Sequence, residues 1–297
     1  GGHYADGLLL DYHGYQTGRV KDSTAEQRSG RRKKQMLSVR EISITYGENP
    51  VPAVADFSLE MKRSEIVSIV GESGSGKTSL VRALLGCLPG GGRVSQGEIL
   101  FEGRALSGLG PEEWRNLRGT EISMIFQDSG AMLNPVRRIG SQYVEYIRTH
   151  ERVSRREAWE KGKEMLEQMR LPAGEHIMRS YPFQLSGGQR QRVGIAMAMT
   201  FQPKLLLADE PTSALDVTTQ AQIVRQMLKL RDEYHTGIIV VTHNLGVAAY
   251  MADRIVVMKE GRIVDAGTRD QILNHPSSPY TKNLLDSVPA MGGYRFV

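Results

Sequence analysis

The alternation of apolar and polar residues is clearest near the start of the chain's patterned region. Residues 37–46, LSVREISITY, and residues 53–61, AVADFSLEM, alternate with a period of two, and a Gly-Glu-Asn-Pro turn lies between them. A period of two places successive side chains on opposite faces of a strand. The two runs therefore predict an antiparallel pair of half-buried strands.

Three other apolar runs are continuous rather than alternating. They are EIVSIV at 65–70, LLLAD at 205–209 and IIVVTH at 238–243, and each leads into a helical stretch. Continuous apolar runs are typical of strands that are buried on both faces of a parallel sheet. The helix after the first run, KTSLVRALLGCL at 77–88, is followed by a proline and three glycines. Parallel strands joined by helices predict an α/β core.

The sequence between these strands has a different pattern. From about 129 to 180 it is polar with helical spacing, as in RREAWEKGKEMLEQMRL at 155–171, and it lacks strong strand signals. This stretch predicts a helical insertion. After residue 253, RIVVMKEGRIVDAG predicts a hairpin with a Glu-Gly turn.

These patterns divide the chain into four parts. Residues 1–35 show neither helical nor strand periodicity and carry RRKK near their end, so we expect a disordered extension or a leftover of the expression vector. Residues 36–128 and 181–262 are expected to form the core, residues 129–180 a helical subdomain, and residues 263–297 a C-terminal segment.

Composition narrows the class of protein. A chain of 297 residues that is 40% hydrophobic can bury a substantial core, and no apolar run approaches the ~20 residues of a membrane-spanning helix. The net charge is +5, but residues 1–35 hold seven Lys and Arg against four Asp and Glu and so supply +3 of it. We therefore do not expect a nucleic-acid partner. With no secretory signal at the start, the single cysteine, Cys87, is expected to be a small core residue in a reducing cytoplasmic setting.

The stretch GESGSGKT at 71–78 matches the spacing GxxxxGK[ST], and it follows a predicted strand and opens a predicted helix. Its glycines let the backbone wrap a phosphate, and the helix N-terminus attracts negative charge. Lys77 would reach the β and γ phosphates, and the Thr78 hydroxyl would bind Mg²⁺. A glycine-serine linker that matches by accident is the alternative. The residues expected to bind nucleotide here are Gly71, Gly74, Ser75, Gly76, Lys77, Thr78 and Ser79.

The stretch LLLADE at 205–210 ends in two carboxylates. An acidic residue at the end of a buried strand can hold Mg²⁺ directly or through water, and Asp209 is so placed. Glu210, one position further on, would lie near the γ phosphate and accept a proton from attacking water, an effect worth about 10² to 10⁴ in rate. The alternative is a helix-capping acidic pair, since DEPTSALD also resembles a capped loop.

Three more side chains are candidates for the same site. His243 ends the apolar run at 238–243, so in a parallel sheet it emerges beside Asp209 and could touch the γ phosphate; a purely structural histidine is the alternative. Gln127 follows the apolar run MIF, and its neutral amide can bind Mg²⁺ or water. Tyr46 ends the first strand, where its ring could stack on adenine or simply pack on the surface.

The stretch LSGGQRQR at 185–192 is a poor strand and a poor first turn for an ordinary surface helix. If Ser186, Gly187 and Gly188 begin a helix, they present a hydroxyl and backbone N–H groups at a positive helix end. This would be a second anion site in one chain, and one nucleotide does not need two cradles so far apart in sequence. We therefore expect it to serve a nucleotide held by another subunit, with two chains packed head to tail and ATP between them.

Together these motifs resemble the ATP-binding cassette family. The resemblance is carried by LSGGQ ahead of an apolar strand that ends in Asp-Glu, by SALD at 213–216, by the glutamine after MIF and by the strand-end histidine. It covers the chain from about Leu37 to the C-terminus. It implies an α/β P-loop NTPase core of the RecA-like type with an antiparallel β subdomain and a helical insertion. It also implies a head-to-tail dimer that closes on ATP binding and reopens after hydrolysis.

The resemblance further implies a role for each candidate residue. Lys77 and Thr78 bind phosphate and Mg²⁺, Asp209 holds Mg²⁺, Glu210 is catalytic and His243 is the switch histidine. Gln127 is the sensing glutamine, expected to act both in catalysis and on the metal. The signature donated to the nucleotide of the second subunit consists of Ser186, Gly187, Gly188 and Gln189.

A narrower resemblance is to the ATPase subunits of oligopeptide, dipeptide and nickel importers, including their C-terminal segment. It is carried by RGTEISMIFQDSGAMLNP at 118–135 and HPSSPYTKNLLDSVPA at 275–290. It implies a second related ATPase, two membrane permeases on which the helical insertion docks, an extracytoplasmic substrate-binding protein, and a location on the cytoplasmic face of the cell membrane. Many members carry a cysteine-rich extension with an iron–sulfur cluster. Because Cys87 is the single cysteine here, we expect no cluster.

Two other functions stay open at this point. A soluble cassette ATPase of translation or DNA repair usually carries two cassettes or long coiled-coil insertions, whereas this sequence holds one cassette and no sustained heptads. A different phosphate-loop enzyme, a kinase or GTPase, would leave LSGGQ and SALD without a role. The sequence does not reveal the transported solute or whether the dimer is homomeric.

Overall fold

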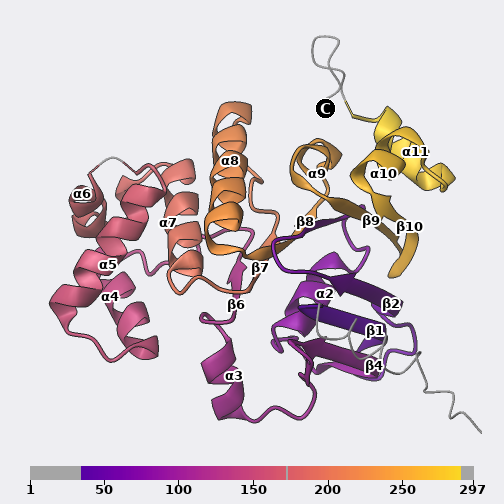
Figure 1. Cartoon of the computed structure of the whole chain (residues 1–297), viewed down its shortest axis with the longest axis horizontal. Coiled ribbons are helices and arrows are strands. Elements are labelled where there is room, and N and C mark those ends of the chain that lie inside the picture. The colour runs from indigo at the N-terminus through magenta and orange to yellow at the C-terminus, as the bar shows by residue number, and fades with distance from the viewer. Residues whose placement is uncertain (1–34, 172, 289–297) are drawn as a thin grey trace, which may run out of the picture. The chain divides into compact units, whose positions relative to one another are not determined.

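The computed structural model describes residues 35–171 and 173–288 (Figure 1). The expectation of a disordered extension at the N-terminus falls on residues 1–34, which lie outside the described residues, as do the last nine residues of the predicted C-terminal segment. The division into core, helical subdomain and C-terminal segment stays a prediction.

The first sheet is antiparallel, with the strand order β2-β1-β4-β5. Its strands are β1 Leu37–Tyr46, β2 Val54–Met61, β4 Gly92–Phe101 and β5 Arg104–Ala105. The predicted pairing of the first two alternating runs is confirmed, because β1 and β2 pair antiparallel from Leu37 opposite Met61 onward. Strand β4 was not predicted, because its first half is largely exposed and polar; it is held by pairing with β1.

The second sheet has six strands in the order β10-β9-β3-β8-β7-β6. They are β3 Ile66–Val70, β6 Ile122–Ile125, β7 Leu205–Asp209, β8 Gly237–Thr242, β9 Arg254–Lys259 and β10 Arg262–Thr268. All neighbours are parallel except the β9–β10 hairpin, which was predicted. Every residue of β3, β7 and β8 is buried, which is why their apolar runs are continuous.

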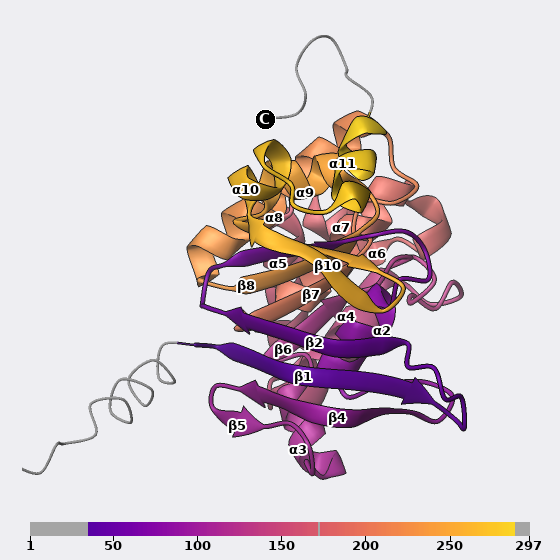
Figure 2. The same cartoon turned by 90° about the vertical axis from the view of Figure 1, so that its right-hand side faces the viewer.

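Helix α2, Lys77–Leu84, packs between the two sheets. Leu80, Val81 and Leu84 are buried in one cluster with β1 residues such as Ile42 and β3 residues such as Ile69. Figure 2 shows β2, β1 and β4 below β10, β8 and β7. This arrangement fixes the start of α2, and therefore the loop before it, against the core.

The structure corrects two expectations for the end of this helix. The helix was predicted to run to residue 88 but ends at Leu84, with Leu85 as its C-cap. Gly86, at φ +63, lies in the left-handed region directly after it, and this stops the helix before the proline does. Cys87 was expected in the core and is instead exposed, because it lies beyond the last packed turn.

Helices fill the stretch between β6 and β7. They are α4 Ile139–His150, α5 Arg155–Gln168, α6 Gly174–Arg179, the 3₁₀ turn Pro182–Gln184, and α7 Gly187–Met199. Ser154 caps α5 by accepting from the Glu157 N–H at 3.2 Å, while the Glu157 carboxylate accepts from the Ser154 N–H. Met199 is fully buried, and Met197 packs against the same core. These helices group at the left of Figure 1.

The remaining helices are α3 Pro111–Leu117, α8 Val217–Tyr234, α9 Leu245–Met251, α10 Arg269–Asn274 and α11 Pro279–Asp286. Of these, α9, α10 and α11 contact strands of the six-stranded sheet, and α8 shares an apolar cluster with β7 and β8. A small apolar cluster joins α9, α10 and α11 to Val70, the last residue of β3. The C-terminal helices are thereby tied to the strand that precedes the phosphate-type loop.

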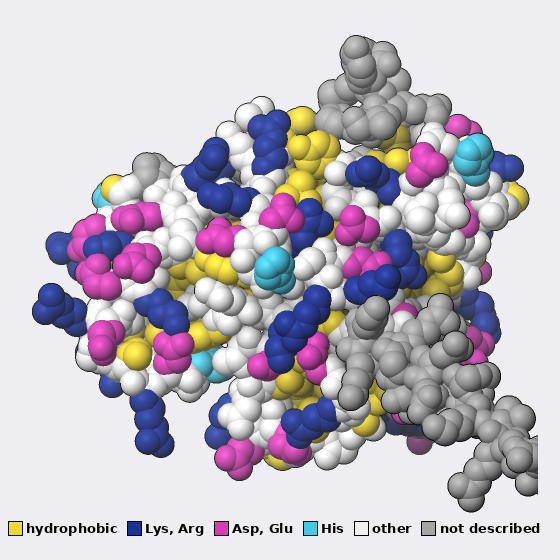
Figure 3. Space-filling view, in the orientation of Figure 1, with side chains coloured by type: hydrophobic (Ala, Val, Ile, Leu, Met, Phe, Trp, Pro, Cys, Tyr) yellow, Lys and Arg dark blue, Asp and Glu magenta, His cyan; other side chains and the backbone are white. Residues whose placement is uncertain are grey.

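On the face drawn in Figure 3, basic and acidic side chains are interspersed. Within residues 35–171 and 173–288, no helix combines the length and the apolar content that a bilayer span needs.

Candidate functional site

A cavity of about 780 Å³ opens at the carboxyl ends of β3, β6, β7 and β8. Ligands of open parallel sheets bind at this edge, and the volume is within the range of small-molecule sites. It collects side chains that lie far apart in the sequence. Its lining includes the predicted residues Gly71, Gly74, Gly76, Lys77, Thr78, Ser79, Gln127, Asp209, Glu210 and His243.

The loop between β3 and α2 requires glycine for steric reasons. Gly76 has φ +97, and a Cβ there would lie 2.5 Å from the carbonyl oxygen of Ala53. A Cβ at Gly71 would lie 2.2 Å from the carbonyl oxygen of Met258. The backbone therefore passes closer to the start of β2 and to β9 than any other residue allows.

Lys77 is held inside this loop. Its Nζ donates to the Gly71 carbonyl at 2.8 Å, to the Glu72 carbonyl at 2.7 Å and to the Ser75 Oγ at 3.1 Å. Burial lowers the pKa of Lys77, against the opposing effect of Glu210, Asp209 and Glu72. Ser75 is buried and contributes to the site through Lys77, not by lining the cavity.

Asp209 and Thr78 meet across the cavity from different elements. The Thr78 hydroxyl, in the first turn of α2, donates to Asp209 Oδ1 at 3.5 Å. Asp209 ends β7 and is 5% exposed, and its burial raises its pKa, while the Thr78 hydrogen bond lowers it and the Glu210 charge raises it further. A hydroxyl next to a buried carboxylate is an oxygen pair of the type that Mg²⁺ prefers.

Glu210 and His243 are in direct contact. Glu210 Oε1 accepts from the His243 backbone N–H at 2.9 Å and lies 2.8 Å from His243 Nδ1, and Glu210 Oε2 accepts from the Thr242 hydroxyl at 3.3 Å. The Glu210 side chain is 11% exposed, whereas that of His243 is 68% exposed. Glu210 also has φ +48, a left-handed conformation that non-glycine residues adopt infrequently. These hydrogen bonds hold the Glu210 carboxylate in one orientation, and the exposed imidazole of His243 lies beside it.

Two other predicted residues lie at the edges of the site. Gln127 is exposed, two residues past the end of β6, and it lines the cavity. Tyr46 does not line the cavity. Its hydroxyl lies 2.9 Å from the Oγ of Ser79, a cavity residue in the first turn of α2, so Tyr46 contacts the site indirectly. Stacking of Tyr46 on adenine stays a prediction.

The predicted signature residues do not line this cavity. Ser186 is the N-cap of α7, and its Oγ accepts from the Gln189 N–H at 3.2 Å while the Gln189 Oε1 accepts from the Ser186 N–H at 2.9 Å. Ser186 and Gly187 are exposed at the surface. A Cβ on Gly188 would lie 2.7 Å from a methyl carbon of Thr219, so this turn packs closely on the start of α8.

Sequence reasoning missed several residues of the cavity wall. These are Ala53, Glu72, Ser73, Val241, Leu284 and Ser287. Glu72 and Ser73 lie inside the loop motif at its variable positions. Leu284 and Ser287 belong to α11 and its C-cap, inside the C-terminal stretch that the sequence singled out, but nothing local to them indicates that they reach the site.

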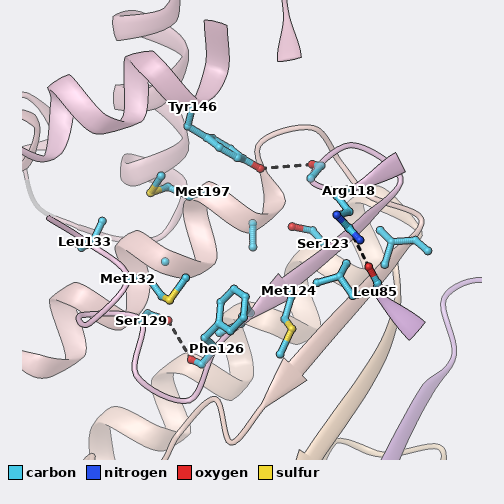
Figure 4. Close-up of a pocket in the computed structure, with 15 residues that line it drawn as sticks. Leu85, Arg118, Ser123, Met124, Phe126, Ser129, Met132, Leu133, Tyr146 and Met197 are labelled. Atoms are coloured by element: carbon cyan, nitrogen blue, oxygen red, sulfur yellow. Dashed lines mark hydrogen bonds between the residues drawn. The ribbon is translucent and has the colours of Figure 1, made fainter. Parts of the chain in front are cut away.

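A second cavity of about 310 Å³ lies between β6 and the helices α4 and α7 (Figure 4). Its wall is mainly apolar and includes Met124, Phe126, Met132 and Met197. Met132 is 61% exposed. Because Phe126 precedes Gln127, this apolar surface is connected through one short loop to the first cavity.

The residues around the first cavity fit a magnesium nucleotide. Among the described residues there is no group of three His, Cys, Asp or Glu side chains that could hold a metal by itself. Mg²⁺ in nucleotide sites usually takes only one or two protein oxygens and completes its shell with phosphate and water, so the Thr78–Asp209 pair is sufficient.

Comparison with known proteins places the chain in a family. A model of the family described as ABC transporter matches residues 54–213. The chain is 45% identical over 268 residues to the glutathione import ATP-binding protein GsiA of Salmonella choleraesuis (strain SC-B67), covering 88% of this chain and 43% of that protein. It is 45% identical over 260 residues to the oligopeptide transport ATP-binding protein OppD of Bacillus subtilis (strain 168), covering 86% of this chain and 72% of that protein. The chain therefore spans less than half the length of GsiA.

A solved structure agrees with these matches. The dimeric post-hydrolysis state of the ATP-binding cassette MJ0796, bound to ADP and Pi, superposes with a TM-score of 0.70 at 32% identity, covering 79% of this chain and 99% of that chain. The predicted fold class, an α/β P-loop core with an antiparallel sheet and inserted helices, is confirmed by this likeness and by the two sheets described above. The chain belongs to the ABC transporter family, and its described part is an ATP-binding cassette of that family.

Proposed function

We propose that this chain binds ATP with Mg²⁺, hydrolyses it, and uses the hydrolysis to power the import of peptides across a membrane. The observation that carries the proposal is the convergence, around one cavity, of a phosphate-type loop, a buried carboxylate pair, an amide and a histidine. The names of GsiA and OppD as import and transport ATP-binding proteins support the direction and the substrate class.

Phosphate binding follows from the loop. The Lys77 Nζ donates to three oxygens of the loop. When ATP binds, Lys77 would donate instead to the β and γ phosphate oxygens. The backbone N–H groups of the loop and the positive end of α2 add further stabilisation of negative charge. Tyr46, from β1, is proposed to stack on the adenine ring.

The metal would be held by the Thr78 hydroxyl and the Asp209 carboxylate, with the Gln127 amide as a third oxygen donor. When bound, Mg²⁺ neutralises charge on the phosphates and polarises the bond to the leaving group. Gln127 lies on the short loop after β6. Because its amide is neutral, binding or release of the metal by this side chain would leave the net charge of the site unchanged.

Glu210 is proposed as the general base. Its carboxylate is oriented by the His243 N–H and the Thr242 hydroxyl, and it accepts a proton from the water that attacks the γ phosphorus. The His243 ring is exposed beside it and is proposed to donate to the γ phosphate. The pair therefore supplies one acceptor and one donor at the end of the nucleotide that reacts.

The site is proposed to be completed by a second cassette. Ser186, Gly187, Gly188 and Gln189 form the start of α7 outside the cavity of their own chain, and Ser186 and Gly187 are exposed. In a head-to-tail dimer they would face the nucleotide of the partner, and the structure of the ATP-binding cassette MJ0796 as a dimer supports a dimeric assembly. The partner is either a second copy or a related ATPase.

Membrane partners are proposed to dock at the second cavity. Its apolar, Met-rich wall and the exposed Met132 form a surface suited to a helix from a permease, and methionine adapts well to partner shape (Figure 4). Two permeases and, indirectly, an extracytoplasmic binding protein complete the proposed importer. The chain would act at the cytoplasmic face of the cell membrane, and nickel is the second candidate cargo.

The test is to purify the Glu210→Gln chain from membranes of its source cells with ATP and Mg²⁺ and to identify the proteins bound to it by mass spectrometry. Recovery of two polytopic permeases and an ATPase supports the importer. Recovery of ribosomal or DNA-repair proteins without any membrane protein would favour the soluble alternative. Glu233→Gln, an exposed change on α8, is the matched control.

A further inference from the structure

The C-terminal helix α11 borders the nucleotide cavity. Leu284 and Ser287 line the cavity, and Tyr280 lies four residues before Leu284, so all three share one face of the helix. The Tyr280 hydroxyl accepts from the Glu72 backbone N–H at 3.2 Å. A residue 208 positions away in sequence therefore bonds the backbone of the phosphate-type loop.

The bonded group belongs to a particular peptide unit. The Glu72 N–H and the Gly71 carbonyl lie in the same planar unit, and that carbonyl accepts from Lys77 Nζ at 2.8 Å. Tyr280 and Lys77 thus hold the two ends of one peptide plane. Because this plane is flanked by Gly71, it can rotate more freely than most when one end is released.

Tyr280 is itself held firmly. Asp265 Oδ2 accepts from the backbone N–H groups of Ser277 and Ser278, each at 2.9 Å, and this fixes the start of α11. The Tyr280 ring packs against the apolar cluster that contains Val70, and Lys259 Nζ lies 5.1 Å from its centroid. The hydroxyl is consequently a fixed acceptor for a loop segment whose own residues, Glu72 and Ser73, are exposed.

We propose that Tyr280 is a positioning residue for nucleotide binding: its hydroxyl orients the Gly71–Glu72 peptide unit, and through that unit it places Lys77 to meet the phosphates. This inference rests on the proposed binding and hydrolysis of ATP. It gives the C-terminal helix a part in nucleotide affinity in addition to its packing.

The test compares Tyr280→Phe with the wild-type chain. Phenylalanine keeps the ring and its packing and removes only the acceptor. Tyr234→Phe is the matched control, because the Tyr234 hydroxyl also makes one surface hydrogen bond, to Gln168 Oε1 at 2.6 Å, on a helix remote from the cavity lining. The measurements are the dissociation constants of fluorescent ADP and ATP analogues, KM and kcat for ATP, and the melting temperature without nucleotide.

Tyr280→Phe is expected to weaken binding of both nucleotides about two- to tenfold, the range of one net hydrogen bond, and to raise KM by a similar factor. The value of kcat should stay within about twofold, since the hydroxyl does not contact the reacting atoms. The melting temperature should change no more than in Tyr234→Phe. The control should bind both nucleotides like the wild type.

Nucleotide affinity equal to that of the wild type, or a fall in melting temperature with no selective loss of affinity, would overturn the role of Tyr280. If the wild-type chain neither binds nor hydrolyses ATP, the proposed function fails and the inference fails with it. If the wild type is active and Tyr280→Phe is indistinguishable from it, the inference alone fails.

Discussion

Two glycines in one loop offer a controlled measure of the steric demand at the phosphate site. Gly74 has φ +83 with nothing within 4 Å of an added Cβ, whereas Gly76 has φ +97 and an added Cβ would lie 2.5 Å from the Ala53 carbonyl oxygen and 2.9 Å from a Val54 methyl. Gly74→Ala therefore costs only the strain of an L-residue at positive φ. Gly76→Ala costs the same strain and adds a steric clash with the Ala53 carbonyl.

The expected magnitudes follow from these two terms. A left-handed conformation costs an L-residue about 1–2 kcal/mol, and overpacking a tight site costs about 1–3 kcal/mol more. We expect Gly74→Ala to lower the free energy of unfolding by about 1–2 kcal/mol and Gly76→Ala by about 2–5 kcal/mol. Gly76→Ala should also lose more ATP affinity, because relief of the clash moves the loop away from β2.

Urea unfolding followed by circular dichroism measures the two differences, and a fluorescent ATP analogue measures affinity. The urea dependence, m, should be the same in both variants, so that the midpoints report stability. Equal destabilisation by the two alanines would show that the contact with Ala53 does not constrain the loop, and the steric reasoning would be refuted.

Two further changes test other parts of the structure. Burial raises the pKa of Asp209 in the folded chain, so ionisation of this carboxyl group favours unfolding. The stability that the protonated carboxyl contributes is therefore lost as pH rises through the folded pKa. Without nucleotide at neutral pH, Asp209→Asn should therefore have a higher melting temperature than the wild type, and this difference should disappear below the unfolded pKa of aspartate. The variant should also lose Mg²⁺-dependent phosphate release. A lower melting temperature than the wild type at pH 7 would contradict this reasoning. Cys87 is exposed, but burial of its sulfur raises its pKa, with Arg118 and Arg82 opposing; the folded chain should react with a thiol reagent, more slowly at pH 8 than free cysteine, and a chain that reacts only after unfolding would restore the core assignment.

The parts of the fold that could be predicted are those with a local cause. Strands β3, β7 and β8 are buried at every position, so their apolar runs stand out in the sequence. Strand β4 has no such run, since most of its first half is exposed and it is a strand because β1 pairs with it. Cys87 was misplaced because the helix stops earlier than its apolar residues suggest.

The same distinction applies to the site. Asp209 and Glu210 lie at the end of the buried strand β7, Lys77 and Thr78 follow the buried strand β3 through a recognisable glycine-rich loop, and such strand ends meet at one edge of the sheet. Leu284 and Tyr280 reach the same edge only because α11 packs against Val70 and is fixed by Asp265, contacts between distant residues that no local pattern encodes. The contact of Tyr46 with Ser79 likewise depends on how the two sheets enclose α2.

The most direct test of the central claim is ATP turnover by the purified chain and by its Glu210→Gln variant, measured as phosphate release with Mg²⁺, alongside ATP affinity. The amide keeps an oxygen that can accept the His243 N–H but cannot act as the base. The wild type should release phosphate, and the variant should bind ATP with similar affinity but turn over at least about 10²-fold more slowly. Unchanged turnover in Glu210→Gln would contradict the assignment of Glu210 as the catalytic base.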